Sequence, residues 1–407
     1  MTTATPTPTT AAPAPAREDR GPRYPLGVIR ALAALSVLTF HAYQLNRTGP
    51  TSAWPWDGLP HQLMLGTDAF VDLFFVLSAL VLWLPVARAA VDGRTGRPGW
   101  VVLVRRMARL LPLYVVVVLL VWAVTNPSLP GHWGDLLLHL TFTHVYSDTY
   151  IFWTNGPAWT LAVEFHFYLL VAALVPLLHR LTAGVADRRR RTALVAAPGV
   201  ALVLAGLAYL AVVVLVVQPE PTNWSITFSP LSRAADFGLG MLLAVLAASG
   251  VRLPRPGRWA AATTGLLALA VLAVQRPHDL SGLWWHPAYA AAIAVALAAV
   301  VLHDGPWPRV LTLPSMTWLG GLGYGIYLIH EPAMRLLGHL GVLPDPAPGG
   351  VFLVTAVLVA VPTVALAWLS SRTVEAGGLR LLRSIDGRGR RVEYYPDGAH
   401  RPAAGAR

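Results

Sequence analysis

Apolar stretches of about twenty residues recur from one end of the chain to the other, separated by short polar segments. About twenty apolar residues are what an α-helix needs to cross the hydrocarbon core of a bilayer. The pattern therefore predicts an all-α polytopic membrane protein with about ten transmembrane helices. The predicted spans are 26–45, 68–87, 104–124, 157–178, 193–217, 233–249, 259–275, 284–302, 317–338 and 351–371.

Arginine is concentrated in alternate connecting segments. Clusters occur before the first span, around 88–109, at 180–191, at 252–258 and after the last span, whereas the 126–156 loop has no basic residue. Arg47 and Arg276 are the clear exceptions. Because basic loops stay on the cytoplasmic side, we expect both termini in the cytoplasm of a multi-pass cell-membrane protein.

Three regions follow from this pattern. Residues 1–25 are rich in Thr, Pro and Ala, so we expect a disordered tail that buries no core. Residues 26–372 form the membrane domain. Residues 373–407 are rich in Gly and Arg, and we expect a basic cytoplasmic tail lying against anionic lipid.

Composition supports the membrane class and excludes several kinds of site. Hydrophobic residues make up 55% of the chain and charged residues only 13%, about half the share usual in soluble proteins. The chain contains no Cys, which excludes disulfides, thiolate metal sites and a cysteine acyl-enzyme. The net charge of +11 is spread over loops, so nucleic acid is not the expected partner.

Arg30 and His41 are the most informative pair of polar residues. Eleven residues of α-helix turn through about 1100°, so both side chains share one face and lie ~16 Å apart along the axis. With Arg30 at the membrane edge, His41 lies near the middle of the bilayer. An ionisable residue at that depth is costly and indicates a functional site.

The next spans carry further candidates. Asp72 lies deeper in its span than Asp68, and we expect a polar partner such as Arg30, His41 or another helix. Glu164 falls two turns into its span and must be protonated, paired or facing water. His166 lies about 200° round the helix from Glu164, so we interpret it as a packing residue.

Three arginines open the third span. In RRMARLLPLY, Arg105 and Arg109 are four residues apart and Arg106 lies alongside. Such arginines serve either as anchors that reach the headgroups or as a fork that binds phosphate. The spacing alone leaves both interpretations open.

These motifs resemble the integral-membrane acyltransferase 3 family over residues 26–372. Arg30 and His41 match its Arg-x10-His signature, and DAFVDLFFVLSAL matches the segment that carries Asp72 and Ser78. Further blocks are RRMARLLPLY, PAWTLAVEFHFYLL, RAADFGLGML and LGGLGYGIYLIHEP, in the family's order. Phe70, Ala79, Thr160 and Gly323 depart from its usual residues. The Arg-rich, Lys-free composition suggests an actinobacterial source.

The resemblance implies an O-acyltransferase with acyl-CoA as co-substrate and no permanently bound cofactor or metal. The implied acceptor is a hydroxyl of a carbohydrate or of a glycosylated metabolite such as a macrolide. We expect four catalytic residues, in which His41 is the base, Asp72 or Glu164 orients it, and Arg30 holds a phosphate or the oxyanion. We expect coenzyme A to bind Arg105, Arg106 and Arg109, and the substrate to contact Trp159, Tyr324 and His330.

Alternatives stay open at this point. Direct transfer is preferred over a covalent acyl-enzyme on Ser78 or His41. A proton-coupled exporter of an acylated or acidic metabolite would use the same buried Asp, Glu and His as a relay. A non-catalytic scaffold fits poorly with so many ionisable groups inside the membrane.

Overall fold

A computed structural model describes residues 24–128, 131–277, 279–303, 305 and 307–386. The described part of the chain is helical and contains no named strand. The helices are α1 (Leu26–Leu45), α2 (Gly58–Leu65), α3 (Ala69–Val91), α4 (Gly99–Thr125), α5 (Trp133–Leu140), α6 (Ala158–Thr182), α7 (Arg188–Val212), α8 (Trp224–Thr227), α9 (Ala234–Ala248), α10 (Arg255–Gln275), α11 (Trp285–Val301), α12 (Pro314–Gly321), α13 (Gly323–His339), α14 (Val351–Arg372) and α15 (Val374–Asp386).

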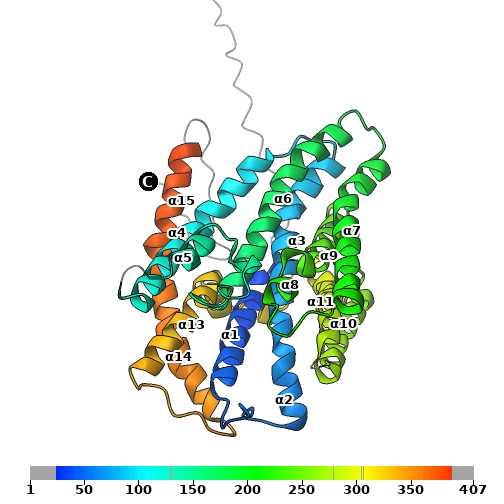
Figure 1. Cartoon of the computed structure of the whole chain (residues 1–407). Coiled ribbons are helices and arrows are strands. Elements are labelled where there is room, and N and C mark those ends of the chain that lie inside the picture. Colours follow the sequence, from blue (N-terminus) through cyan, green and yellow to red (C-terminus); the bar gives the residue numbers. More distant parts are fainter. Residues whose placement is uncertain (1–23, 129–130, 278, 304, 306, 387–407) are drawn as a thin grey trace, which may run out of the picture.

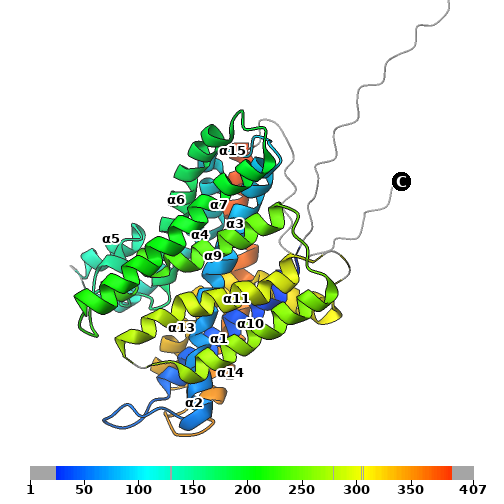
Figure 2. The same cartoon turned by 90° about the vertical axis from the view of Figure 1, so that its right-hand side faces the viewer.

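The helices form one bundle with α1 at its centre (Figure 1). On one side lie α4, α14 and α15, and on the other lie α7, α10 and α11. The view turned by 90° shows α10 and α11 running side by side along the edge of the bundle (Figure 2), and these two helices pack on each other. Helix α3 packs on α1 and α6, and α9 packs on α3, α7 and α11.

Nine helical segments among the described residues are long and apolar enough to cross a membrane. They correspond to nine of the ten predicted spans, and the first, Leu26–Leu45, coincides with its prediction. The prediction of one continuous helix over 317–338 is wrong. This region is divided at Leu322 into α12 and α13, where four glycines occur within six residues and weaken the helix.

Small residues allow the central helices to approach closely. A Cβ atom added at Gly240 of α9 would meet the carbonyl oxygen of Val76 and the side chain of Ala79 on α3. Gly320 of α12 lies directly against the backbone of Gly27 on α1. Such small-residue contacts are the usual way for membrane helices to associate, because lipid supplies no hydrophobic force between them.

The sequence predicts a tail at each end of the chain, residues 1–25 and 373–407. Residues 1–23 of the predicted N-terminal tail lie outside the described residues. The C-terminal segment begins with α15, which packs on α4, so that Gly378 lies against Ala108 and Pro112. One side of α15 therefore packs on the bundle, and the expectation that the segment lies against anionic lipid stays a prediction.

Candidate functional site

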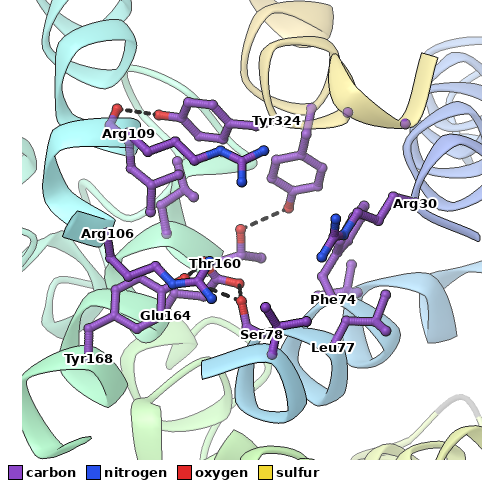
Figure 3. A pocket seen from close by; sticks show the side chains of 17 residues that line it. Arg30, Phe74, Leu77, Ser78, Arg106, Arg109, Thr160, Glu164, Tyr168 and Tyr324 are labelled. Carbon is purple, nitrogen blue, oxygen red and sulfur yellow. Dashed lines mark hydrogen bonds between the residues drawn. The ribbon is translucent and has the colours of Figure 1, made fainter. Parts of the chain in front are cut away.

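A pocket of about 120 Å³ lies where α1, α3, α4, α6 and α13 meet. We call it the arginine pocket, because Arg30, Arg106 and Arg109 line it. Arg30 reaches in from α1, and Arg106 and Arg109 reach in from the opposite wall on α4 (Figure 3). Helices α1 and α4 thus contribute three guanidinium groups to one pocket.

Arg105 is not among the residues that line this pocket, so its predicted contact with coenzyme A stays a prediction. On the helix Arg109 lies between the other two, about 40° from Arg105 and about 60° from Arg106, so the pocket is on the Arg106 side of Arg109. Tyr324 lines the pocket as well, and its hydroxyl donates a 2.6 Å hydrogen bond to the Leu110 carbonyl. That bond ties α13 to α4 beside Arg109.

Glu164 forms the polar floor of the arginine pocket. Its carboxylate accepts hydrogen bonds from the Ser78 hydroxyl and the Tyr168 hydroxyl, each at 2.6 Å. The charges of Arg106 and Arg30 act on the same carboxylate. The Arg106 guanidinium also lies 6.0 Å from the centre of the Tyr168 ring. Glu164 therefore places a carboxylate near the guanidinium groups of this pocket.

A second and larger hollow, of about 730 Å³, begins beside the first. We call it the histidine cavity, because His41 of α1 and His286 of α11 both line it. Four aromatic residues and four arginines are also part of its wall: Phe40, Phe152, Trp159, Phe228, Arg47, Arg233, Arg276 and Arg335. Arg276 pairs with Asp68, and Arg335 pairs with Glu331.

His41 is held by another histidine. Its Nδ1 lies 2.7 Å from Nε2 of His330, and Nδ1 of His330 lies 3.2 Å from the Ile326 carbonyl. A carbonyl only accepts, so His330 carries its proton on Nδ1 and its Nε2 accepts from Nδ1–H of His41. Nε2 of His41 is then the atom with a lone pair, as a general base requires.

Neither carboxylate predicted to orient His41 does so. Glu164 bonds Ser78 and Tyr168, and Asp72 accepts from Nδ1 of His286, which lies 3.1 Å from both of its oxygens. This prediction is wrong because α3 turns Asp72 toward α11 rather than toward α1. The prediction that Asp72 has a partner on another helix is confirmed.

His330 and His286 are the site residues whose roles the residue pattern alone did not indicate. His330 was expected to contact the substrate, and it is fully buried with its Nε2 against His41. His286 was not singled out, although its motif Trp-Trp-His-Pro places a lone polar side chain at the start of an apolar helix. This isolated polar residue in an apolar segment is the sequence feature that could have identified His286.

Trp159 lies under the guanidinium of Arg233. The Arg233 carbon is 5.6 Å from the Trp159 ring centre and 6.0 Å from that of Phe228. Arg233 is buried, and so is Asp236 next to it. The buried cation is therefore stabilised by the ring faces, and Trp159, which also lines the histidine cavity, keeps its predicted substrate contact as a prediction.

The remaining polar candidates add no further centre. Nδ1 of His166 lies 2.7 Å from the Ala162 carbonyl, a bond that fits a packing residue. Within the described ranges, no group of three or more His, Cys, Asp or Glu side chains is placed to hold a metal ion.

Comparisons with known proteins show the family to which the chain belongs. "Acyltransferase MdmB" of Streptomyces mycarofaciens is 29% identical over 395 residues, which are 91% of this chain and 94% of that protein. "Putative acetyltransferase ORF330" of Acidianus two-tailed virus is 26% identical over 324 residues, 77% of this chain and 84% of the viral protein. No solved structure matches the chain. The family model described as an acyltransferase domain matches residues 24–372. The chain therefore belongs to the acyltransferase 3 family of membrane proteins.

Proposed function

We propose that this acyltransferase moves a short acyl group from acyl-CoA to a hydroxyl of a carbohydrate or of a glycosylated metabolite such as a macrolide. The observation that carries the proposal is the adjacency of the arginine pocket and the histidine cavity. The arginine pocket contains three guanidinium groups, and the histidine cavity contains His41, the candidate base. The name of the Streptomyces relative supports acyl transfer.

The arginine pocket suits the phosphates of coenzyme A. A guanidinium presents planar N–H donors that match phosphate oxygens, and such charge-assisted bonds are about twice as strong as neutral ones. Arg30, Arg106 and Arg109 approach from two sides and can grip one phosphate between them. Glu164 balances part of their charge when no donor is bound.

His41 serves as the general base. Its Nε2 takes the proton of the acceptor hydroxyl while that oxygen attacks the thioester carbonyl. The tetrahedral intermediate collapses, the C–S bond breaks, and His41 returns the proton to the leaving thiolate. Ester and free coenzyme A are the products, and no covalent acyl-enzyme is required.

A transfer assay tests this function. Membranes containing the protein are incubated with acetyl-CoA labelled in the acetyl group and with methyl glucoside or tylosin as hydroxyl probes. We expect label in the probe and none with His41→Ala. Because the chain lacks Cys, thiol release by the purified protein is measured without background. A pH-driven flux of acetylated probe without any transfer would instead support the exporter.

The predicted orientation, with both termini in the cytoplasm, supports a donor site on the cytoplasmic side. The arginine-rich segments and the arginine pocket then face the compartment that holds acyl-CoA. Single cysteines at exposed loop positions test this: we expect Ser128→Cys, but not Thr95→Cys, to react with an impermeant maleimide in intact cells. The opposite labelling pattern would contradict the orientation.

A further inference from the structure

Two residues form the boundary between the arginine pocket and the histidine cavity. Among the described residues, Val71 of α3 and Tyr327 of α13 are the two that line both. Every other residue of either wall belongs to one hollow alone. Val71 and Tyr327 therefore separate the two hollows, and a group that moves from one to the other has to pass between them.

Tyr327 is fixed in this boundary. Its hydroxyl accepts a 3.0 Å hydrogen bond from the Thr160 hydroxyl and donates a 3.3 Å bond to the Pro157 carbonyl. Its ring packs edge-on against Phe74, with ring centres 5.5 Å apart, and against His330, at 5.9 Å. A side chain held at its tip and on its faces does not swing aside at low cost.

Val71 is rigid for a different reason. Its branched Cβ leaves one strongly preferred rotamer in a helix. Val71 is also half-buried and packs against the hydrophobic core. The opening thus has one stiff aliphatic side and one stiff aromatic side.

We propose that Val71 and Tyr327 form a constriction that the acyl group must enter to reach His41, and that it selects unbranched over branched acyl chains. This inference rests on the proposed function. The arginines hold the coenzyme A end on one side of the boundary, and the base lies on the other. The thioester carbonyl meets the acceptor only if the acyl group passes between the two side chains.

A constriction selects by cross-section and not by length. Each methylene of a linear chain has the same width, and the histidine cavity, at about 730 Å³, has room for several methylenes beyond the boundary. A methyl branch next to the carbonyl widens the group at the narrowest point. One misplaced methyl in an apolar site changes discrimination by roughly 10–200-fold.

The experiment compares two isomeric donors. Transfer from butyryl-CoA and isobutyryl-CoA to methyl glucoside and tylosin is measured for the full-length protein in membranes. We expect Val71→Ala to raise the isobutyryl-to-butyryl rate ratio about tenfold, and Val71→Ile to lower it. Val300→Ala is the matched control, since Val300 is another half-buried core valine that lines neither hollow.

Opposite shifts from the two Val71 variants separate selection from misfolding, because loss of folded protein lowers both rates equally and leaves the ratio unchanged. An unchanged ratio in both variants, or the same rise in Val300→Ala, would overturn the constriction while the acyltransferase activity stands. If the wild-type protein uses neither donor nor acetyl-CoA, the proposed function fails and the constriction fails with it.

Discussion

His41 donates a hydrogen bond from Nδ1 to Nε2 of His330 across 2.7 Å, and the two rings stack with centres 4.9 Å apart. This relationship joins α1 to α13 inside the bundle. A neutral imidazole takes the place that a carboxylate fills in the more familiar base and carboxylate pairs. It sets the tautomer of His41 without placing a further negative charge inside the membrane.

The first prediction concerns His330 as the positioning residue of His41. We expect His330→Ala to lower kcat about 100-fold, the lower end of what a positioned base contributes, with little change in KM for acyl-CoA. His330→Gln keeps a side-chain acceptor and should restore part of the rate. Steady-state kinetics with labelled acetyl-CoA measures both constants. Equal losses in the two variants would indicate a packing role.

The second prediction separates donor binding from turnover. Arg30→Ala should raise the Kd for acyl-CoA about tenfold, because it removes one charge-assisted contact. His41→Ala should abolish turnover and keep donor binding. Equilibrium binding of acetyl-CoA to the purified variants makes the comparison. If both variants lose donor binding to the same extent, the division between pocket and cavity is wrong.

The third prediction concerns the buried pair of Asp72 and His286. Removing one partner leaves the other unsatisfied, at a cost of about 1–3 kcal/mol. We expect Asp72→Ala and His286→Phe to destabilise the protein individually, and the double variant to lose less than the sum. Thermal unfolding in detergent measures the coupling. Asp72→Ala with His166→Phe is the control cycle, which should be additive.

The fourth prediction concerns the contact between α12 and α1. A Cβ at Gly320 would overlap the Gly27 carbonyl, whereas nothing lies within 4 Å of a Cβ at Gly321. We expect Gly320→Ala to destabilise the protein by about 1–3 kcal/mol. Gly321→Ala should be neutral or slightly stabilising, because alanine favours the helix. Equal melting temperatures of the two variants would contradict the close approach.

The fifth prediction concerns acid stability of the 126–156 segment. Burial lowers the pKa of His144 well below its ordinary value, and its stacked neighbour His139 adds to the effect. His144 therefore binds a proton more readily in the unfolded segment than in the folded one. Stability should be complete above about pH 6.5 and fall as the pH drops below it.

Limited proteolysis of this segment between pH 5 and pH 8 tests the fifth prediction. We expect faster cleavage at acid pH in the wild type. His144→Phe should flatten the dependence, while His132→Gln, at an exposed position of the same segment, should keep it. An acid-labile His144→Phe protein would show that another group titrates.

Local patterns determined the spans and part of the site. Nine of ten predicted spans correspond to helices that can cross a membrane, since span length depends only on consecutive apolar residues. Arg106 and Arg109 share a wall because a three-residue separation brings side chains together on any helix. Period and length are properties of one segment, and the sequence displays them directly.

The tertiary structure alone decided which polar groups meet. His41 and His330 are 289 residues apart, and Asp72 finds His286 rather than His41 because of how α3 is rotated against α11. The close approach of Gly320 to Gly27 likewise joins two segments far apart in the sequence. Helix rotation and depth result from packing summed over the whole bundle. The sequence of a single helix does not determine its rotation or depth. A buried charge could therefore be expected to have a partner, but that partner could not be identified.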